Sequence, residues 1–349
     1  MASSSKAWIL TGQEGPQSLK FVENQELPPL GDHDVRVKIQ AASLNYRDIA
    51  IAKGTYGLTI EPNVVPGSDG AGVVEAVGSS VNKFQPGDHV CTHMTSGMTE
   101  NAPATFADIG GGLGQRIDGT LRTHGVFHDT SLVKMPRNLS FDEAATLTCS
   151  ALTAWNGLFG IEGREPKKGH VVLVQGTGGV SIAALQFALA AGATVTATTS
   201  SDEKAARLRS LGAQHVINYK ITPNWGEEAK RVTPDGKGVH TVIDVGGLST
   251  LRQSLHAVRP EGMIALTGLL GQAPDGDIPN IMDGLLHLCT TRGLLLGTRA
   301  QFEAMNQFLE EKNVKPVLDD KVFPLQETKE AFEYMSQQHH FSKIVIHIS

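Results

Sequence analysis

A glycine-rich turn is the part of this sequence whose residue types point most directly to chemistry. The apolar run 171–174 leads into Gly176, Thr177, Gly178, Gly179, Val180 and Ser181, and a helix-forming run over 183–191 follows. This order predicts a strand, a tight turn and a helix N-terminus. Glycines let the backbone approach a pyrophosphate, whose charge is favoured by free N–H groups and by the helix dipole. We therefore expect residues 176–180 to bind a dinucleotide. A plain structural turn is the alternative, because Ser181 replaces the third glycine of the usual pattern.

The end of the next predicted strand bears on which dinucleotide is bound. NAD-selective domains usually carry an acidic residue there, about 20 residues after the glycines, to bind the ribose hydroxyls. Here the strand ends at Thr199, followed by Ser200 and Ser201. Hydroxyls and Lys204 can bind a 2′-phosphate that no carboxylate repels, so we expect NADPH. Two alternatives remain: Ser200 and Glu203 have the spacing of a helix capping box, and an acidic residue at 202 or 203 could still reach a ribose.

Three possible metal ligands alternate along another predicted strand. His89, Cys91 and His93 would all point to one face of it, and such ligands can bind a metal. The interpretation that we favour is a strand of the N-terminal domain whose histidines are partly buried and satisfied by neighbours.

The elements around the glycine turn alternate between strands and helices. The predicted strands are 194–199, 215–219, 241–245 and 263–267, with a sixth at 294–296, and the predicted helices are 202–211, 225–232 and 248–257. This alternation predicts a doubly wound parallel sheet over residues 151–290. Ligands bind beyond the carboxyl ends of such strands. Possible cofactor contacts, each of which could instead be a turn residue, are therefore Gly246, Thr267, Gly268, Leu269 and Gly297.

The rest of the chain has a different pattern. Short alternating runs at 34–41, 67–77 and 88–92 predict a β-rich, barrel-like domain. After the parallel sheet come an amphipathic helix at 325–338 and a strand at 343–348, which we expect to rejoin the N-terminal sheet. The predicted domains are thus 1–150 together with 291–349, and 151–290.

Composition excludes several classes of protein. The chain has 349 residues, 40% of them hydrophobic and 19% charged, and a net charge of -6. These values are typical of a globular protein and argue against binding to nucleic acid or to anionic membranes. Three scattered cysteines do not make a disulfide framework. No run resembles a signal peptide or a membrane span, so we expect a cytoplasmic protein.

The order of the motifs resembles the medium-chain dehydrogenase/reductase superfamily. The resemblance rests on the runs 66–74, 85–90 and 176–181, and covers essentially the whole chain. It implies a GroES-like N-terminal domain, a Rossmann domain, a nicotinamide cofactor, and a homodimer joined through edge strands. It is closest to the zinc-free branch that includes quinone oxidoreductases and enoyl reductases. Zinc enzymes of the superfamily carry a Cys, a His-Glu pair and a later Cys, whereas this chain has Asn45, Ser68-Asp69 and Cys149. We therefore expect no catalytic metal.

The same resemblance suggests roles for other residues. Asn45 stands where quinone reductases place a residue near the nicotinamide ribose, and Tyr46 could line the substrate pocket. Tyr56 matches the proton-donating tyrosine of mitochondrial-type enoyl thioester reductases, although it could also be only a pocket wall. Thr153 matches the threonine near the nicotinamide carboxamide, or it caps a helix. Tyr219 matches a tyrosine that NADP-using relatives place beside the 2′-phosphate.

These observations predict a hydride-transferring enzyme. Without a metal, the substrate must be activated already or polarised by a hydrogen-bond donor. We expect NADPH-dependent, zinc-independent reduction of a small activated alkene (enone or enoyl thioester) or of a quinone. The alternatives are a metal-free NADP(H)-dependent alcohol or carbonyl oxidoreductase, and a nucleotide-binding structural or regulatory protein with little turnover.

Overall fold

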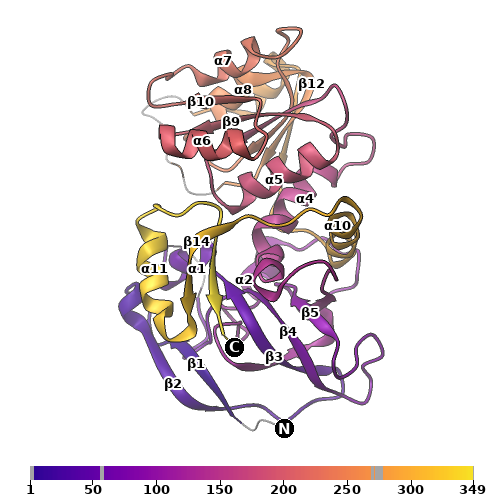
Figure 1. The fold of residues 1–349 in the computed structure, drawn as a ribbon, viewed down its shortest axis with the longest axis vertical. Coiled ribbons are helices and arrows are strands. Elements are labelled where there is room, and N and C mark those ends of the chain that lie inside the picture. The colour runs from indigo at the N-terminus through magenta and orange to yellow at the C-terminus, as the bar shows by residue number, and fades with distance from the viewer. Residues whose placement is uncertain (1–3, 56–58, 269–270, 272–277, 349) are drawn as a thin grey trace. The chain divides into compact units, whose positions relative to one another are not determined.

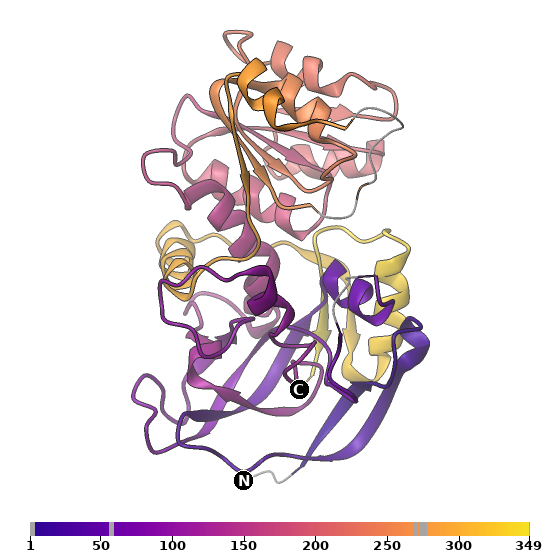
Figure 2. The same ribbon diagram turned by 180° about the vertical axis from the view of Figure 1, so that it is seen from behind.

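The chain forms two compact units, which Figures 1 and 2 show from opposite sides. The computed structural model describes residues 4–55, 59–268, 271 and 278–348. The first unit combines residues Met1–Leu152 with Leu296–Ser349, and the second is Thr153–Leu295. One unit is therefore assembled from both ends of the chain, and the other from a single continuous segment.

The second unit is built on a six-stranded parallel sheet with the order β10-β9-β8-β11-β12-β13. This order is that of a doubly wound dinucleotide-binding sheet, so the predicted fold class is confirmed. Helices α5 and α6 pack on β8, β9 and β10, and α8 packs on β11 and β12. The strands are β8 Val171–Gln175, β9 Thr194–Thr199, β10 His215–Asn218, β11 Val239–Asp244, β12 Val258–Leu266 and β13 Thr290–Gly293, and the helices are α4 Leu152–Phe159, α5 Gly179–Ala190, α6 Asp202–Ser210, α7 Trp225–Arg231, α8 Leu251–Ala257 and α9 Ile281–Leu286.

The first unit is rich in β-structure, as the sequence predicts. Its main sheet has the order β14-β15-β3-β4-β5-β7, with β6 also paired to β3, and β1 and β2 form a separate hairpin. The strands are β1 Ser4–Leu10, β2 Leu19–Glu26, β3 Asp34–Ser43, β4 Asp69–Val77, β5 His89–Thr92, β6 His124–His128, β7 Leu132–Lys134, β14 Leu318–Pro324 and β15 Lys343–His347. The helices are α1 Tyr46–Ala52, α2 Phe106–Gly110, α3 Phe141–Ala144, α10 Arg299–Lys312 and α11 Thr328–Ser336.

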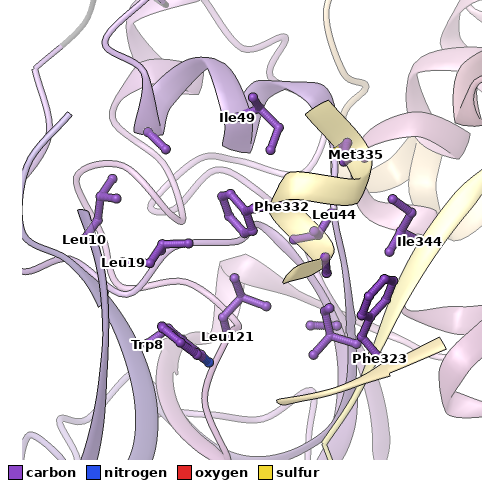
Figure 3. Close-up of a cluster of buried hydrophobic side chains, with 14 of the residues drawn as sticks. Trp8, Leu10, Leu19, Leu44, Ile49, Leu121, Phe323, Phe332, Met335 and Ile344 are labelled. Carbon is purple, nitrogen blue, oxygen red and sulfur yellow. The ribbon is translucent and has the colours of Figure 1, made fainter. Parts of the chain in front are cut away.

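The C-terminal strand rejoins the N-terminal sheet, and this expectation is confirmed. β15 pairs antiparallel with β3, with Val345 opposite Ser43. Side chains from both ends of the chain share one core there, among them Leu44, Phe332 and Ile344 (Figure 3). Burial of large apolar side chains supplies most of the stabilisation of such a core. This core also holds the residues that flank Asn45 and Lys343 in the sequence.

Several element boundaries differ from the predicted ones. The sixth strand of the parallel sheet is Thr290–Gly293, earlier than the expected 294–296. The expected helix 325–338 is a short 3-10 turn, Leu325–Glu327, followed by α11. Helix α10 was not predicted, although its buried residues Phe302, Met305 and Leu309 have the spacing of one helix face. No helix in the described ranges is long and apolar enough to cross a membrane.

Candidate active site

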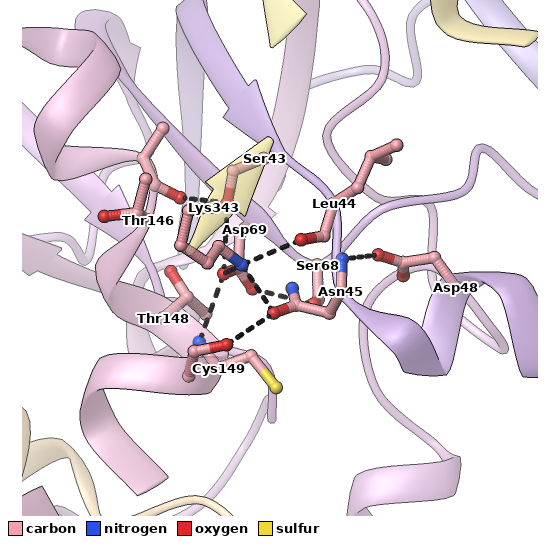
Figure 4. Close-up of polar contacts among 12 residues, drawn as sticks. Ser43, Leu44, Asn45, Asp48, Ser68, Asp69, Thr146, Thr148, Cys149 and Lys343 are labelled. Carbon is pink, nitrogen blue, oxygen red and sulfur yellow. Dashed lines mark hydrogen bonds and ion pairs between the residues drawn. The ribbon is translucent and has the colours of Figure 1, made fainter. Parts of the chain in front are cut away.

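A cluster of buried polar side chains lies at one end of the main sheet of the first unit (Figure 4). The sheet register explains how four distant segments meet there. β3 lies between β4 and β15, so that its last residue, Ser43, pairs with Asp69 on one side and Val345 on the other. Asn45 follows β3 and precedes α1, and Lys343 begins β15. A π-helix, Leu147–Ala151, supplies the fourth segment.

Asp69 is the charged centre of this cluster and is 0% exposed. Its Oδ2 atom lies 3.3 Å from the Lys343 ammonium, and accepts hydrogen bonds from the Ser43 hydroxyl at 3.4 Å and the Cys149 backbone N–H at 3.3 Å. Its Oδ1 atom accepts from the Ser68 hydroxyl at 2.9 Å. A buried ion pair is tolerated only when further hydrogen bonds satisfy both partners, and Asp69 meets that condition.

Asn45 lies beside this ion pair and is 5% exposed. Its Oδ1 atom accepts from Lys343 Nζ at 2.5 Å and from the Ser150 hydroxyl at 3.0 Å. Its backbone N–H donates to the Asp48 carboxylate at 2.8 Å, at the start of α1. Its Nδ2 atom is buried and has no hydrogen-bond partner in the part of the chain that the structure describes. Asn45 therefore keeps two N–H donors that nothing described here uses.

Burial changes the acidity of two neighbouring groups. Burial raises the pKa of the Asp48 carboxyl to about 6, although the nearby Arg47 guanidinium acts in the opposite direction. Burial also raises the pKa of the Cys149 thiol to about 12, and the Asp69 charge adds to this. At neutral pH, Cys149 is therefore a protonated thiol and not a thiolate nucleophile.

The donor set of this cluster does not fit a catalytic zinc. It consists of an amide, a hydroxyl, a carboxylate and a thiol, whereas catalytic zinc is held by three strong ligands such as His, Cys and Asp or Glu. The Lys343 ammonium also occupies oxygens of both Asn45 and Asp69. Among the described residues, no group of three or more His, Cys, Asp or Glu side chains could hold a metal ion.

The alternating trio His89, Cys91 and His93 does not converge on a shared point. His89 is exposed at the start of β5 and its ring packs against Phe141, whereas the buried Cys91 thiol faces the Ala144 carbonyl at 3.6 Å. His93 is buried, and its Nε2 atom lies 3.1 Å from the Gly297 carbonyl. Burial lowers the pKa of His93. His93 matches the interpretation that we favoured, a histidine satisfied by its neighbours, whereas His89 is exposed.

The glycine turn of the second unit has the form of a phosphate cradle. Gly176 adopts φ +73°, and a Cβ atom added at Gly176 or Gly178 would meet nothing within 4 Å. Gly178 is the N-cap of α5 and has no side chain to bond the N–H groups of the first helical turn. Ser181 replaces the third glycine without disturbing the turn, because its hydroxyl donates to the Gln175 carbonyl at 2.6 Å. The turn fits the pyrophosphate of a dinucleotide.

The end of β9 lies beside the end of β10, as the parallel register requires. The Tyr219 backbone N–H donates to the Thr199 carbonyl at 3.0 Å, which brings Tyr219 next to the position where an acidic residue is missing. Ser201 is the N-cap of α6, and its hydroxyl accepts from the Lys204 N–H at 3.2 Å. The alternative cap at Ser200 is therefore wrong by one residue, because the helix starts at Asp202. Ser200 belongs to the preceding turn.

Comparison with known proteins identifies the family. Residues 31–137 match the alcohol dehydrogenase GroES-like domain family, and residues 179–311 match the zinc-binding dehydrogenase family. A zinc-type alcohol dehydrogenase-like protein of Schizosaccharomyces pombe is 46% identical over 331 residues, which cover 93% of this chain and 94% of that protein. The chain belongs to the medium-chain dehydrogenase/reductase superfamily. It is an oxidoreductase, and oxidoreductases of this superfamily use nicotinamide cofactors.

Two further relatives differ in the cofactor that their names give. An NADPH-dependent alkenal/one oxidoreductase of Arabidopsis thaliana is 30% identical over 346 residues, which cover 98% of this chain and 79% of that protein. A solved NAD-dependent alcohol dehydrogenase has a TM-score of 0.85 and 30% identity, and the match covers 99% of this chain and 100% of that one. These similarities establish the superfamily. Cofactor choice and zinc dependence have to be inferred from the residues of this chain.

A second polar network, which the sequence did not predict, lies at the carboxyl edge of the parallel sheet of this dehydrogenase/reductase. Asp244, at the end of β11, accepts from Gln175 Nε2 at 3.1 Å, Ser254 Oγ at 2.6 Å, Thr250 Oγ1 at 2.7 Å and the Gly247 N–H at 2.9 Å. Gln175 Oε1 accepts from the Gly246 N–H at 3.4 Å. The available signal was a polar residue, Gln175 or Asp244, directly after the apolar residues at the end of each strand.

The remaining predicted cofactor contacts have mixed placements. Thr267 follows β12, and its N–H donates to the Asp244 carbonyl at 2.8 Å, so it does lie at the carboxyl edge of the sheet. Gly268 is required for packing there, because a Cβ atom would approach the Val245 carbonyl oxygen within 2.1 Å. Gly297 belongs to the first unit, where a Cβ atom would contact Leu152. Leu269 lies outside the described residues.

The remaining predicted catalytic and nicotinamide-binding residues lie around α1 and α4 or outside the described residues. Thr153 lies inside a continuous helical stretch that runs from the π-helix into α4, so it is not a helix N-cap. Tyr46 is the first residue of α1 and is partly exposed. Tyr56 lies outside the described residues. Lys343, which contacts both Asn45 and Asp69, was not singled out from the sequence.

Proposed function

We propose that this chain is an NADPH-dependent, zinc-independent reductase of small activated alkenes (enones or enoyl thioesters) or quinones. The observation that carries the proposal is the cluster around Asn45. The positions that bind zinc in other members of the superfamily hold Asn45 and Asp69, which both accept from Lys343, and Ser68, whose hydroxyl donates to Asp69. A substrate that already delocalises the incoming electron pair onto an oxygen needs no Lewis acid.

A bound nicotinamide cofactor would supply the hydride to the alkene carbon. The alkene electron pair then moves to the carbonyl oxygen, and a proton must reach the neighbouring carbon or that oxygen. Asn45 would stabilise the developing oxygen charge through its unused N–H donors. Tyr56 remains the proposed proton donor. Because the pKa of Asp48 is raised to about 6, a second proton-holding group lies close to Asn45.

The choice of NADPH is supported by the end of β9. Thr199, Ser200 and Ser201 place hydroxyls there and no carboxylate, and Tyr219 is hydrogen-bonded to the same point. Lys204 is in the first turn of α6, next to these residues. The Arabidopsis relative is named for the same cofactor and for alkenal and enone reduction.

The proposed function is tested by single-turnover oxidation of bound NADPH. We would mix the enzyme–NADPH complex with a quinone, an enone, an enoyl thioester and an aldehyde in parallel, and follow nicotinamide absorbance. A fast phase with an enone, thioester or quinone is expected. A fast phase with the aldehyde alone would favour the metal-free carbonyl oxidoreductase, and no fast phase with any probe would favour the non-catalytic nucleotide-binding protein.

Zinc independence is tested separately by elemental analysis of protein purified without chelators. We expect far less than one zinc per chain and full activity after dialysis against a chelator. Close to one zinc per chain, with activity lost on its removal and restored by zinc, would contradict this part of the proposal.

We also propose that the active protein is a homodimer of two identical chains. β13 lies at the edge of the parallel sheet, and unpaired edges favour pairing with another chain. Beside it, α9 exposes apolar side chains, with Ile281 92% and Leu285 62% exposed. Sedimentation should give a dimer for the wild type and for a Val322→Glu control in the first unit. It should give a monomer for the double variant Ile281→Glu/Leu285→Glu, and a wild-type monomer would contradict the proposal.

A further inference from the structure

The orientation of the Asn45 side chain is settled by the chemistry of its neighbours. An ammonium can only donate, so the atom that Lys343 Nζ approaches at 2.5 Å must be the amide oxygen. The Ser150 hydroxyl lies 3.0 Å from the same atom and can donate to it. The Asn45 NH₂ group therefore points away from both, and its two N–H donors are left over.

Lys343 is itself held firmly. Its three N–H donors go to the Leu44 carbonyl at 2.9 Å, Asn45 Oδ1 at 2.5 Å and Asp69 Oδ2 at 3.3 Å, and the residue is 4% exposed. Its chain neighbour Ile344 is fully buried in the core of the first unit. All its donors are used internally, so Lys343 has none left for a ligand and can act only through its partners.

The unused Asn45 NH₂ is the observation that points to a ligand. A buried donor without a partner destabilises the folded protein and is rare. Flipping the Asn45 amide cannot relieve this cost, because the flip would turn its NH₂ group toward the Lys343 ammonium. The network thus keeps two N–H donors available, and this destabilises the ligand-free protein. Such an arrangement is expected where an oxygen of a bound ligand accepts the missing hydrogen bonds.

We propose that Lys343 is a positioning residue, which fixes and polarises the Asn45 amide so that its NH₂ donates to an oxygen of the bound reactants. That oxygen is either the carbonyl oxygen of the substrate or a hydroxyl of the nicotinamide ribose. The proposal rests on the proposed function, since it assumes a nicotinamide cofactor and an oxygen-bearing substrate. It adds a residue of the last strand, Lys343, to the residues on which the reaction depends.

The test is a double-mutant cycle between Lys343 and Asn45. Lys343→Met alone would leave the Asp69 charge unpaired, so Asp69→Asn is introduced with it to keep the cluster neutral. The variants are Asn45→Ala, Lys343→Met/Asp69→Asn, and all three changes together, with Lys321→Met as a lysine control at the surface of the same unit. The measurements are the single-turnover rate with cyclohex-2-en-1-one and with 1,4-naphthoquinone, and the NADPH dissociation constant from fluorescence titration.

Loss of one oxygen-stabilising donor typically lowers the rate about 10²–10³-fold. We therefore expect Asn45→Ala to lower the single-turnover rate or the NADPH affinity by about that factor. Lys343→Met/Asp69→Asn should lower the same quantity at least about tenfold. In the Asn45→Ala background, the Lys343 change should add less than about twofold, since residues that act as a unit are not additive. A merely structural role for Lys343 would instead give effects that multiply, and this result would overturn the proposal. A wild-type rate and NADPH affinity in Lys343→Met/Asp69→Asn would overturn it as well.

The two possible oxygens separate in the same data. A loss of rate at saturating NADPH with unchanged NADPH affinity assigns the substrate oxygen, whereas weaker NADPH binding assigns the ribose hydroxyl. Failure of the proposed function is distinguishable, because it appears in the wild type as no turnover of either probe. The NADPH titrations would still complete the cycle in that case, and additive or absent effects on NADPH binding would then overturn the proposal.

Discussion

Asp69 and Asp244 are both 0% exposed, one in each unit, yet they are satisfied in different ways. Asp69 is paired with the Lys343 ammonium, and the nearby Asn45 and Asp48 each keep a buried polar atom without a hydrogen-bond partner among the described residues. Asp244 accepts only from neutral donors, and no atom of its partners Gln175 and Ser254 is left unpaired within the described ranges. A closed network fixes a shape, whereas one with unused donors is prepared for a ligand. We therefore propose that the Asp244 network is a structural framework and that the Asp69 cluster belongs to the reaction site.

The largest expected effect comes from breaking the charge pair of the first unit. Asp69→Ala leaves the Lys343 ammonium buried without its carboxylate, and such a change typically costs about 3–5 kcal/mol of unfolding free energy. Urea unfolding, followed by tryptophan fluorescence, measures it. The double variant Asp69→Ala/Lys343→Met should lose clearly less than Asp69→Ala alone. An equal or greater loss in the double variant would show that the ion pair does not determine the cost.

A smaller loss is expected when the neutral network of the second unit is changed. Asp244→Asn keeps the shape of the side chain but turns one acceptor into a donor facing Gln175 or Gly247. One mismatched buried hydrogen bond costs about 1–3 kcal/mol. The same urea titration checks it, with Asp235→Asn at the surface as the control. A loss as large as that of Asp69→Ala would contradict the distinction drawn between the two carboxylates.

The contrast between the two networks also shows what the sequence could predict. The glycine turn and the end of β9 are local features, so their residue types carried enough information to place them. Asn45 was identified only because the motif around it resembles a known family. Lys343 contacts Asn45 across 298 positions of sequence, and Asp244 contacts Gln175 across 69. Such pairs are created by sheet register, which no local pattern contains, so both were missed.

An intermediate effect is expected at the cofactor end of the second unit. A charge-assisted hydrogen bond to a 2′-phosphate is worth roughly 1.5–3 kcal/mol. Lys204→Ala should therefore weaken NADPH binding by about ten- to a hundredfold and leave NADH binding nearly unchanged. Fluorescence titration with both cofactors measures this, and Lys230→Ala in α7 is the matched control. Single-turnover rates at saturating NADPH should stay at the wild-type value. The Asn45 variants should differ in this respect if Asn45 binds the substrate oxygen. An equal loss for NADPH and NADH would mean that Lys204 supports only the helix.

The smallest expected effect is a pH dependence that belongs to the first unit. The folded pKa of Asp48, about 6, lies above the ordinary value of 3.8 because the carboxyl is buried. The native state therefore binds this proton more tightly than the unfolded state does. The stabilisation from that proton is complete below pH 3.8 and is lost as the pH rises through 6. Relative to Asp48→Asn, which cannot titrate, the wild type should lose about 1.4 kcal/mol of unfolding free energy between pH 5 and pH 7.5.

Urea unfolding of both proteins at the two pH values measures the difference. A constant difference would mean that Arg47 and the Asn45 N–H already hold Asp48 ionised at pH 5. Asp48 Oδ1, which lies 3.9 Å from Arg47 Nη1, would then be a charged acceptor near Asn45, and not a group that can hold a proton for the reaction.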